Sequence, residues 1–154
     1  MADPKRVDEC IKALEVLSCS KAEGGPSSTI VAVKVEQDVV RVRNEARELA
    51  VALGFSLTGR TRLATAVSEL ARNIVQYAGE GEIELKAVIP SGLEVTARDR
   101  GPGILNLDEI MTGNYRSKLG MGLGLRGVKQ LADAFEVNTG AGKGTTVTFV
   151  LRVQ

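Results

Sequence analysis

Apolar and polar residues alternate in several short stretches of this chain, and this period is typical of strands that bury one face. The predicted strands are residues 29–35, 83–89, 93–97, 135–139 and 145–153. Ser91 and Gly92 separate the second stretch from the third and predict a hairpin. A glycine-rich turn joins the last two stretches, which therefore predict a further pair of strands.

Longer stretches place an apolar residue at every third or fourth position and predict helices. One begins at Gln37 and ends at Gly54, and the next begins at about Thr61 and ends at Gly79. Another begins among the glycines that precede Leu125 and continues to Phe135. The apolar face expected on the second of these helices consists of Leu63, Ala66, Val67, Leu70, Ile74 and Tyr77.

These elements predict an α/β fold, a two-layer sandwich in which helices cover a mixed, mainly antiparallel sheet. We expect the domain to occupy residues 29–154, preceded in residues 1–28 by an extension with an amphipathic helix at 4–18 and a linker. That helix either docks on its own domain or binds a partner. Residues 101–120 break the periodic pattern around a short apolar piece at 107–111 and predict a mobile lid.

Composition narrows the possible functions. Lys and Arg number 20 and Asp and Glu 19, a formal net charge of +1, so no overall basic field favours nucleic acid as a partner. The chain contains no histidine, so it cannot carry a phosphohistidine, a Ser-His-Asp triad or a histidine-ligated zinc ion. With no predicted signal segment or membrane span, we expect a cytoplasmic protein with Cys10 and Cys19 as reduced thiols.

Glu69 and Asn73 are four residues apart and share one face of the second helix. An amide oxygen is a hard ligand that suits Mg²⁺, and a carboxylate one turn earlier can orient or deprotonate a hydroxyl. The same spacing also fits a surface helix on which Glu69 pairs with Arg72 and Asn73 is merely tolerated.

A second motif follows the predicted hairpin. Asp99 ends a strand and precedes Gly101-Pro102-Gly103, so its carboxylate could accept a hydrogen bond from the amine of adenine while the glycines let the backbone approach the base. A simple turn from strand to loop explains these residues equally well.

Two further motifs lie towards the C-terminus. Gly120, Gly122 and Gly124 precede a helix, whose free N–H groups can bind phosphate, although a flexible turn fits the glycines too. The segment lacks the P-loop lysine and the βαβ setting of a Rossmann site. Thr145 begins a strand, and its hydroxyl could reach Asp99 or the adenine edge if the two strands are neighbours.

Basic residues flank the glycine segment. One of them could stabilise charge on a transferring phosphoryl group, whereas solvated lid charges are the simpler interpretation. They are Arg116, Lys118 and Arg126.

In their order and spacing, residues 68–73, 99–104 and 122–129 resemble the GHKL (Bergerat-fold) ATP-binding family, and within it the small serine/threonine kinases and anti-sigma factors of bacterial partner switching. The resemblance implies ATP and Mg²⁺ as cofactors, with Asn73 as the metal ligand and Glu69 as the catalytic carboxylate. The residues it implies in nucleotide binding are Asn73, Asp99, Gly101, Gly103, Gly120, Gly122, Gly124, Leu125 and Thr145.

The resemblance also implies partners. Members phosphorylate a serine or threonine of a STAS-domain antagonist and then act on another partner, a PP2C-type phosphatase or a sigma factor. We therefore expect a serine/threonine protein kinase of stress-response switching. The alternatives are an ATP-binding anti-sigma factor or adaptor that sequesters its partner with little transfer, and a structural domain that binds no nucleotide.

Overall fold

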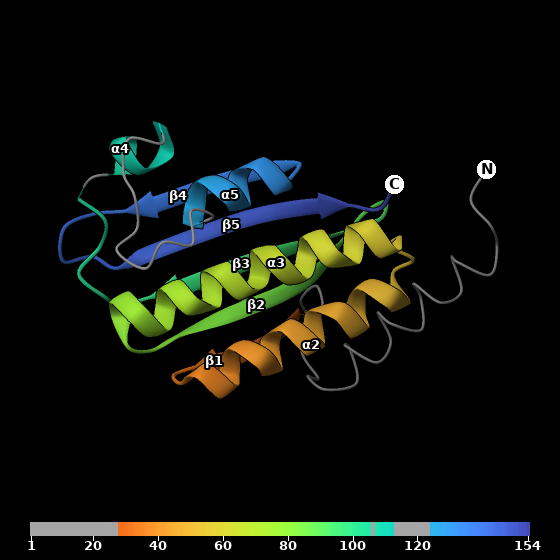
Figure 1. The fold of residues 1–154 in the computed structure, drawn as a ribbon, viewed down its shortest axis with the longest axis horizontal. Helices are drawn as coiled ribbons and strands as arrows, with labels where there is room; N and C mark the ends of the chain where they lie inside the picture. The colour runs from red at the N-terminus through yellow and green to blue at the C-terminus, as the bar shows by residue number, and fades with distance from the viewer. Residues whose placement is uncertain (1–27, 106, 113–123) are drawn as a thin grey trace.

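The computed structural model describes residues 28–105, 107–112 and 124–154 (Figure 1). The strands are β1 (Ser28–Val33), β2 (Gly81–Val88), β3 (Gly92–Asp99), β4 (Ala134–Thr139) and β5 (Thr145–Arg152). The helices are α2 (Glu36–Ala52), α3 (Leu57–Asn73), the π-helical turn η1 (Ile74–Ala78), α4 (Leu107–Thr112) and α5 (Gly124–Leu131). The helix predicted at residues 4–18 and both cysteines lie outside the described residues.

The strands form one five-stranded sheet in the order β1-β2-β3-β5-β4. Helices α2, α3 and α5 lie against one of its faces, which confirms the two-layer α/β sandwich (Figure 1). Each strand pairing is antiparallel, so the described sheet has no parallel pair of the kind a mixed sheet would contain. The connection from β1 to β2 explains this, because two successive helices return the chain to the end of the sheet where β1 finished.

The core lies between the sheet and the helices, and it is built from rows of residues that face each other across the strands. One row joins Leu85, Val95, Phe149 and Phe135 in register on successive strands. Directly opposite residues of an antiparallel pair point to the same face, so each row presents a continuous apolar surface to the helices. The predicted apolar face of α3 packs on this surface, with Leu63, Val67, Leu70 and Ile74 buried.

Helix α3 begins at Leu57, four residues before the start predicted at Thr61. The side chain of Ser56 accepts a hydrogen bond from the Gly59 N–H at 3.1 Å and so caps the helix. This cap stabilises a first turn that contains Gly59. Because glycine has a low helix propensity, the sequence alone did not predict that the helix begins there.

The first strand and the first described helix also differ from prediction at their junction. Strand β1 ends at Val33, and Val35 is exposed at the N-terminal boundary of α2 instead of continuing the buried strand face. The Asp38 carboxylate accepts the backbone N–H groups of Lys34 and Val35 at 2.9 and 3.2 Å, which turns the chain into the helix. The same two hydrogen bonds hold the pKa of Asp38 below its ordinary value.

Tyr77 is not part of the buried face of α3 as predicted, because 56% of it is exposed. The helix widens into the π turn η1 after Asn73, and the change in residues per turn takes Tyr77 out of the phase that buries Ile74. Gly79, with φ of 84°, then ends the turn as the sequence predicts.

The last helix is shorter than predicted, because α5 ends at Leu131 and Phe135 belongs to β4. The Asp133 N–H donates to the Val150 carbonyl, and the Asp133 carboxylate accepts the Arg152 N–H at 2.7 Å. These bonds attach the chain to β5 immediately after the helix. Within the described residues, no helix is long and apolar enough to cross a bilayer.

We predict that Leu70→Ala lowers the free energy of unfolding by about 2–5 kcal/mol, because it leaves a cavity where α3 packs on the sheet. Leu70 is 1% exposed. Urea denaturation followed by circular dichroism measures the change. Leu105→Ala is the matched control, since Leu105 is 83% exposed and its truncation should change stability by less than about 0.5 kcal/mol. Equal losses in both variants would contradict this packing.

Candidate functional site

One row of residues crosses the sheet at its end and organises the candidate site. Gly81 of β2 faces Asp99 of β3, Asp99 faces Thr145 of β5, and Thr145 faces Thr139 of β4. A side chain at Gly81 would meet Ile74 of η1, which shows that this row points to the helical side of the sheet. The sequence prediction that Asp99 and Thr145 lie on neighbouring strands is confirmed.

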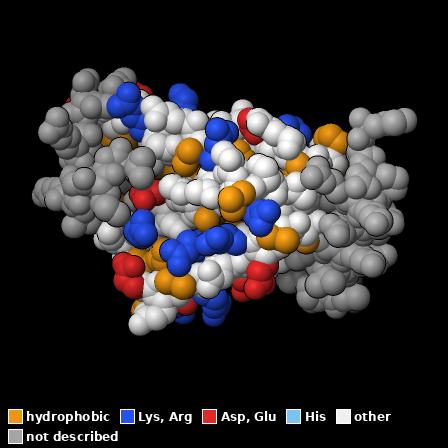
Figure 2. All heavy atoms as spheres, turned by 45° about the vertical axis from the view of Figure 1, so that its right-hand side comes forward, with side chains coloured by type: hydrophobic (Ala, Val, Ile, Leu, Met, Phe, Trp, Pro, Cys, Tyr) orange, Lys and Arg blue, Asp and Glu red, His pale blue; other side chains and the backbone are white. Residues whose placement is uncertain are grey.

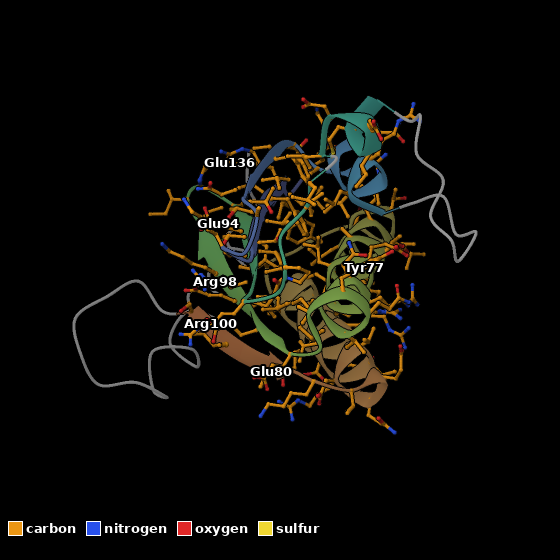
Figure 3. All side chains as sticks on the ribbon, turned by 90° about the vertical axis from the view of Figure 1, so that its left-hand side faces the viewer. Tyr77, Glu80, Glu94, Arg98, Arg100 and Glu136 are labelled. Carbon is orange, nitrogen blue, oxygen red and sulfur yellow. The ribbon has the colours of Figure 1, made fainter. Side chains whose placement is uncertain are left out.

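The residue before Asp99 shows the opposite orientation. Arg98 extends from the outer face of the sheet, away from the helices (Figure 3), where its guanidinium pairs with Glu82 at 3.6 Å and Glu84 at 2.8 Å. Successive side chains of β3 thus point to opposite faces of the sheet. Arg98 joins an ion-paired surface on the outer face, and the Asp99 carboxylate faces the helices.

The Asp99 carboxylate is held by the turn that follows it. Its Oδ1 atom accepts the Gly101 N–H at 2.8 Å. No other hydrogen bond to this carboxylate is found from the described residues, so Oδ2 retains its capacity to accept one from a ligand.

The Thr139 hydroxyl joins three parts of the site. It accepts the Ile104 N–H at 2.9 Å, lies 3.0 Å from the Thr145 hydroxyl and donates to the Gly144 carbonyl at 3.2 Å. Because Thr139 has a single hydroxyl proton, the Thr145 hydroxyl must donate to Thr139 in this arrangement. In that arrangement the Thr145 hydroxyl offers acceptor lone pairs to a further group.

The glycines after Asp99 are needed for contacts within the protein. A side chain at Gly101 would collide with Ala78 at the end of η1, and one at Gly103 would collide with the carbonyl of Gly140. Gly103 also has φ of 80°, a conformation that favours glycine. The two glycines therefore allow this loop to pack tightly against η1 and Gly140. The sequence had suggested instead that they leave room for a nucleotide base.

Glu69 and Asn73 lie in the last two turns of α3. The Glu69 side chain is 10% exposed, and its Oε1 atom is 3.0 Å from Nη1 of Arg72, whose side chain is 32% exposed. The ion pair foreseen in the surface-helix interpretation is therefore present, although Glu69 is buried and not a solvated surface residue. Asn73 is the last residue of α3 and is half-buried.

Contacts between elements bring these residues into one region. Helix α3 packs on α5, while η1 packs on β2 and β3 and so carries the Asp99 turn against the end of α3. Gly124 begins α5, and Leu125 is buried behind it. Gly120, Gly122, Arg116 and Lys118 lie outside the described residues; Arg126 is exposed on α5.

Sequence reasoning missed two residues of this region. The sequence predicts only that Thr139 lies in a strand. Its hydrogen bonds to the neighbouring loop and strand depend on the register between strands, which the sequence does not reveal. Tyr77 was assigned to the core, yet its ring is exposed on the helical side, one turn beyond Asn73 (Figure 3). An exposed aromatic face at this place can stack on a base.

The donor set of the region is oxygen-rich and contains no histidine or cysteine. Within the ranges that the structure describes, no group of three or more His, Cys, Asp or Glu side chains converges on one point. Asn73, a single neutral oxygen donor, fits a Mg²⁺ ion that keeps several waters and binds substrate phosphates.

Comparison with known families defines the class of this protein. Residues 58–154 match the family described as histidine kinase-, DNA gyrase B- and HSP90-like ATPase, and the chain belongs to this family. The matched segment begins in α3 and includes the whole row at the sheet end, but not β1 or α2.

One relative within this family is similar to most of the chain. The serine/threonine-protein kinase RsbT of Bacillus subtilis (strain 168) is 42% identical over 120 residues, which are 76% of this chain and 90% of RsbT.

Solved structures share the fold. The RsbU and RsbW domains of Rv1364c from Mycobacterium tuberculosis align with a TM-score of 0.60 and 18% identity over 81% of this chain, which spans only 32% of that one. The histidine kinase domain of the blue-light activated kinase EL346 from Erythrobacter litoralis has a TM-score of 0.50 and 19% identity, covering 99% of this chain and 76% of that one.

We predict that Thr139→Val lowers the free energy of unfolding by about 1–3 kcal/mol, because it leaves the Ile104 N–H and the Gly144 carbonyl without their partner. Hydrogen exchange at Ile104 should accelerate as well. The control is Thr146→Val, the next residue of β5 after Thr145, which points to the outer face of the sheet. If Ile104 keeps its protection in the Thr139 variant, the hydroxyl does not hold the loop.

Proposed function

We propose that this chain is an ATP-dependent serine/threonine protein kinase that phosphorylates a serine or threonine of a STAS-domain antagonist protein in a bacterial partner-switching pathway. The observation that carries the proposal is the 42% identity to RsbT over 90% of that kinase. The position of Glu69 beside Asn73 on α3 supports it, because phosphoryl transfer needs a carboxylate for the acceptor and an oxygen ligand for Mg²⁺.

In this proposal the row at the sheet end holds the adenine. The free oxygen of Asp99 accepts the exocyclic amine, and the Thr145 lone pairs accept from the base edge directly or through water. Gly101 and Gly103 shape the turn that presents Asp99. Tyr77 offers an aromatic face to the base.

The proposal assigns the phosphates to the start of α5, the helix that packs on α3. Gly120, Gly122, Gly124 and Leu125 are the residues proposed to hold them at the start of α5. Asn73 would ligate Mg²⁺, and the bound ion would neutralise charge on the phosphate oxygens.

Glu69 is the proposed catalytic carboxylate. Its Oε1 atom is held by Arg72, which fixes the orientation of the side chain and leaves Oε2 to accept the proton of the acceptor hydroxyl. The hydroxyl oxygen then forms a bond to the γ-phosphorus as the bond to the β–γ bridging oxygen breaks, and ADP departs with that electron pair.

The acceptor lies on another chain in this proposal. The family includes histidine kinases, but these 154 residues contain no histidine to receive the phosphoryl group. A hydroxyl of a protein partner is the acceptor that the relative's name, a serine/threonine-protein kinase, supports.

We predict that Glu69→Gln slows transfer of the γ-phosphate by about 10²- to 10⁴-fold, because the amide cannot accept the acceptor's proton. Transfer from labelled ATP to a STAS-domain protein measures the rate, and the thermal shift with Mg-ATP should stay as in wild type. Glu94→Gln, on the outer face of the sheet (Figure 3), is the control for loss of one carboxylate. Wild-type rates in the Glu69 variant would refute the assigned role.

We predict that Asp99→Asn weakens ATP binding by about tenfold, the value of a hydrogen bond to a charged group. The Asn oxygen can still accept the Gly101 N–H, so the turn should persist and the melting temperature without nucleotide should change little. Isothermal titration with Mg-ATP measures the affinity. The control Glu136→Gln removes a carboxylate from β4 on the outer face (Figure 3). If both variants bind ATP equally well, Asp99 does not contact the nucleotide.

A further inference from the structure

A groove of about 300 Å³ lies between α2 and α3, on their solvent side. We call it the basic groove and define it by Arg43 and Arg47 of α2 and by Thr65, Ser68, Glu69 and Arg72 of α3. Lys and Arg side chains gather in the middle of the molecular face shown in Figure 2. The groove shares Glu69 with the proposed catalytic machinery, so whatever fills it lies beside that carboxylate.

The charge of the groove is not balanced by the protein. Three arginines and one glutamate line it, a formal charge of +2. Glu69 pairs with Arg72, and no ion pair of Arg43 or Arg47 is found among the described residues. The Nε–H of Arg43 is buried and has no hydrogen-bond partner. A buried donor without a partner costs free energy that a bound acceptor would recover.

The chemistry of the lining favours a carboxylate. Arginine presents a planar set of donors that binds a carboxylate through two parallel hydrogen bonds. Thr65 and Ser68 are small, and the Ser68 hydroxyl is already bonded to the Ala64 carbonyl at 2.7 Å, so these residues leave space without competing for the arginines.

The two α2 arginines place this groove apart from the row proposed to hold the adenine. Arg43 and Arg47 precede residues 58–154, the segment that matches the ATPase family model, but they lie within the stretch of 120 residues that matches RsbT. The row with Asp99 lies at the end of the sheet, where it adjoins η1 instead of α2. The groove is therefore separate from the row proposed to hold the adenine.

We propose that the basic groove binds an acidic side chain, Asp or Glu, of the protein substrate and thereby places the acceptor hydroxyl next to Glu69. This inference rests on the proposed kinase function and names how its substrate is recognised. Arg72 acts as a positioning residue, because its guanidinium has five donors and only one of them is needed for Glu69. The carboxylate of the substrate's acidic residue and the Glu69 carboxylate both accept hydrogen bonds from Arg72. Docking of the substrate thereby influences the orientation of the Glu69 side chain.

The first experiment tests the groove without any phosphoryl transfer. A fluorescein-labelled polyglutamate peptide is titrated with the full chain, and anisotropy is recorded at low salt. Wild type should bind the peptide, and the double variant Arg43→Gln/Arg47→Gln should bind it about tenfold more weakly, as expected for lost charge pairs. The matched control is Arg62→Gln, an exposed α3 arginine that does not line the groove.

Each other outcome of that titration overturns the inference. If Arg62→Gln weakens peptide binding as much as the double variant does, the loss reflects only the net charge of the protein. If the double variant binds the peptide as tightly as wild type, the acidic peptide binds outside the groove. Displacement of the peptide by Mg-ATP would assign the groove to the nucleotide. If the double variant does not fold, Arg47→Gln alone serves, because Arg47 is exposed and its loss should still weaken binding.

The second experiment measures transfer to a STAS-domain protein. The double variant should raise KM for the protein substrate about tenfold and leave KM for ATP unchanged, since only docking is affected. An unchanged KM for the protein would overturn the inference. Absence of transfer by wild type would refute the proposed kinase function instead, and the peptide titration would still decide whether the groove binds an acid.

Discussion

The antiparallel register of β3 with β5 and of β5 with β4 is the constraint on which the candidate site depends. It aligns Asp99, Thr145 and Thr139 in one row, and the pleat then directs all three side chains to the helices. A slip of one residue would replace this row by Arg98 and its outward-facing neighbours. The apolar rows further along the same strands prevent such a slip, because it would expose Phe149 and Val147. The hydrophobic core thus determines where a carboxylate far from its centre points.

Helix α3 combines two demands that conflict at Glu69. Its apolar residues must lie on the sheet, and the same helix carries a carboxylate into a largely buried position where an isolated charge would be unfavourable. Arg72, one turn further, resolves the conflict by pairing with Glu69 while remaining one-third exposed. An ion pair that looked in the sequence like an ordinary surface contact therefore makes a buried carboxylate possible. The π turn after Asn73 then changes the phase of the helix and releases Tyr77 from the core.

The sequence predicted most of the fold and part of the site, and the differences have physical causes. Strands and the hairpin were predicted because one buried face imposes a strict period of two, and Asp99 was placed correctly at the end of a strand. The start of α3 was missed because Ser56 supplies a local cap to a turn with a glycine. Phe135 was correctly placed in the strand 135–139, but it was also counted as the end of the preceding helix because its spacing fits period 3.6. Thr139 could not be found, since its importance arises from partners 35 and 6 residues away. The groove could not be predicted for the same reason, because Arg43 and Arg72 line one groove only after α2 packs on α3.

Helices α2 and α3 together form the surface around Glu69. Residues 58–154 carry most of α3, the Asp99 row and the start of α5, which are the parts proposed to bind ATP. Helix α2 precedes that segment and packs along α3, where its Arg43 and Arg47 line one groove with Glu69 and Arg72. A change in α2 can therefore alter what approaches the carboxylate without moving the residues proposed to bind ATP. The proposed docking of an acidic side chain would then depend on Arg43 and Arg47, for which no ion pair is found among the described residues.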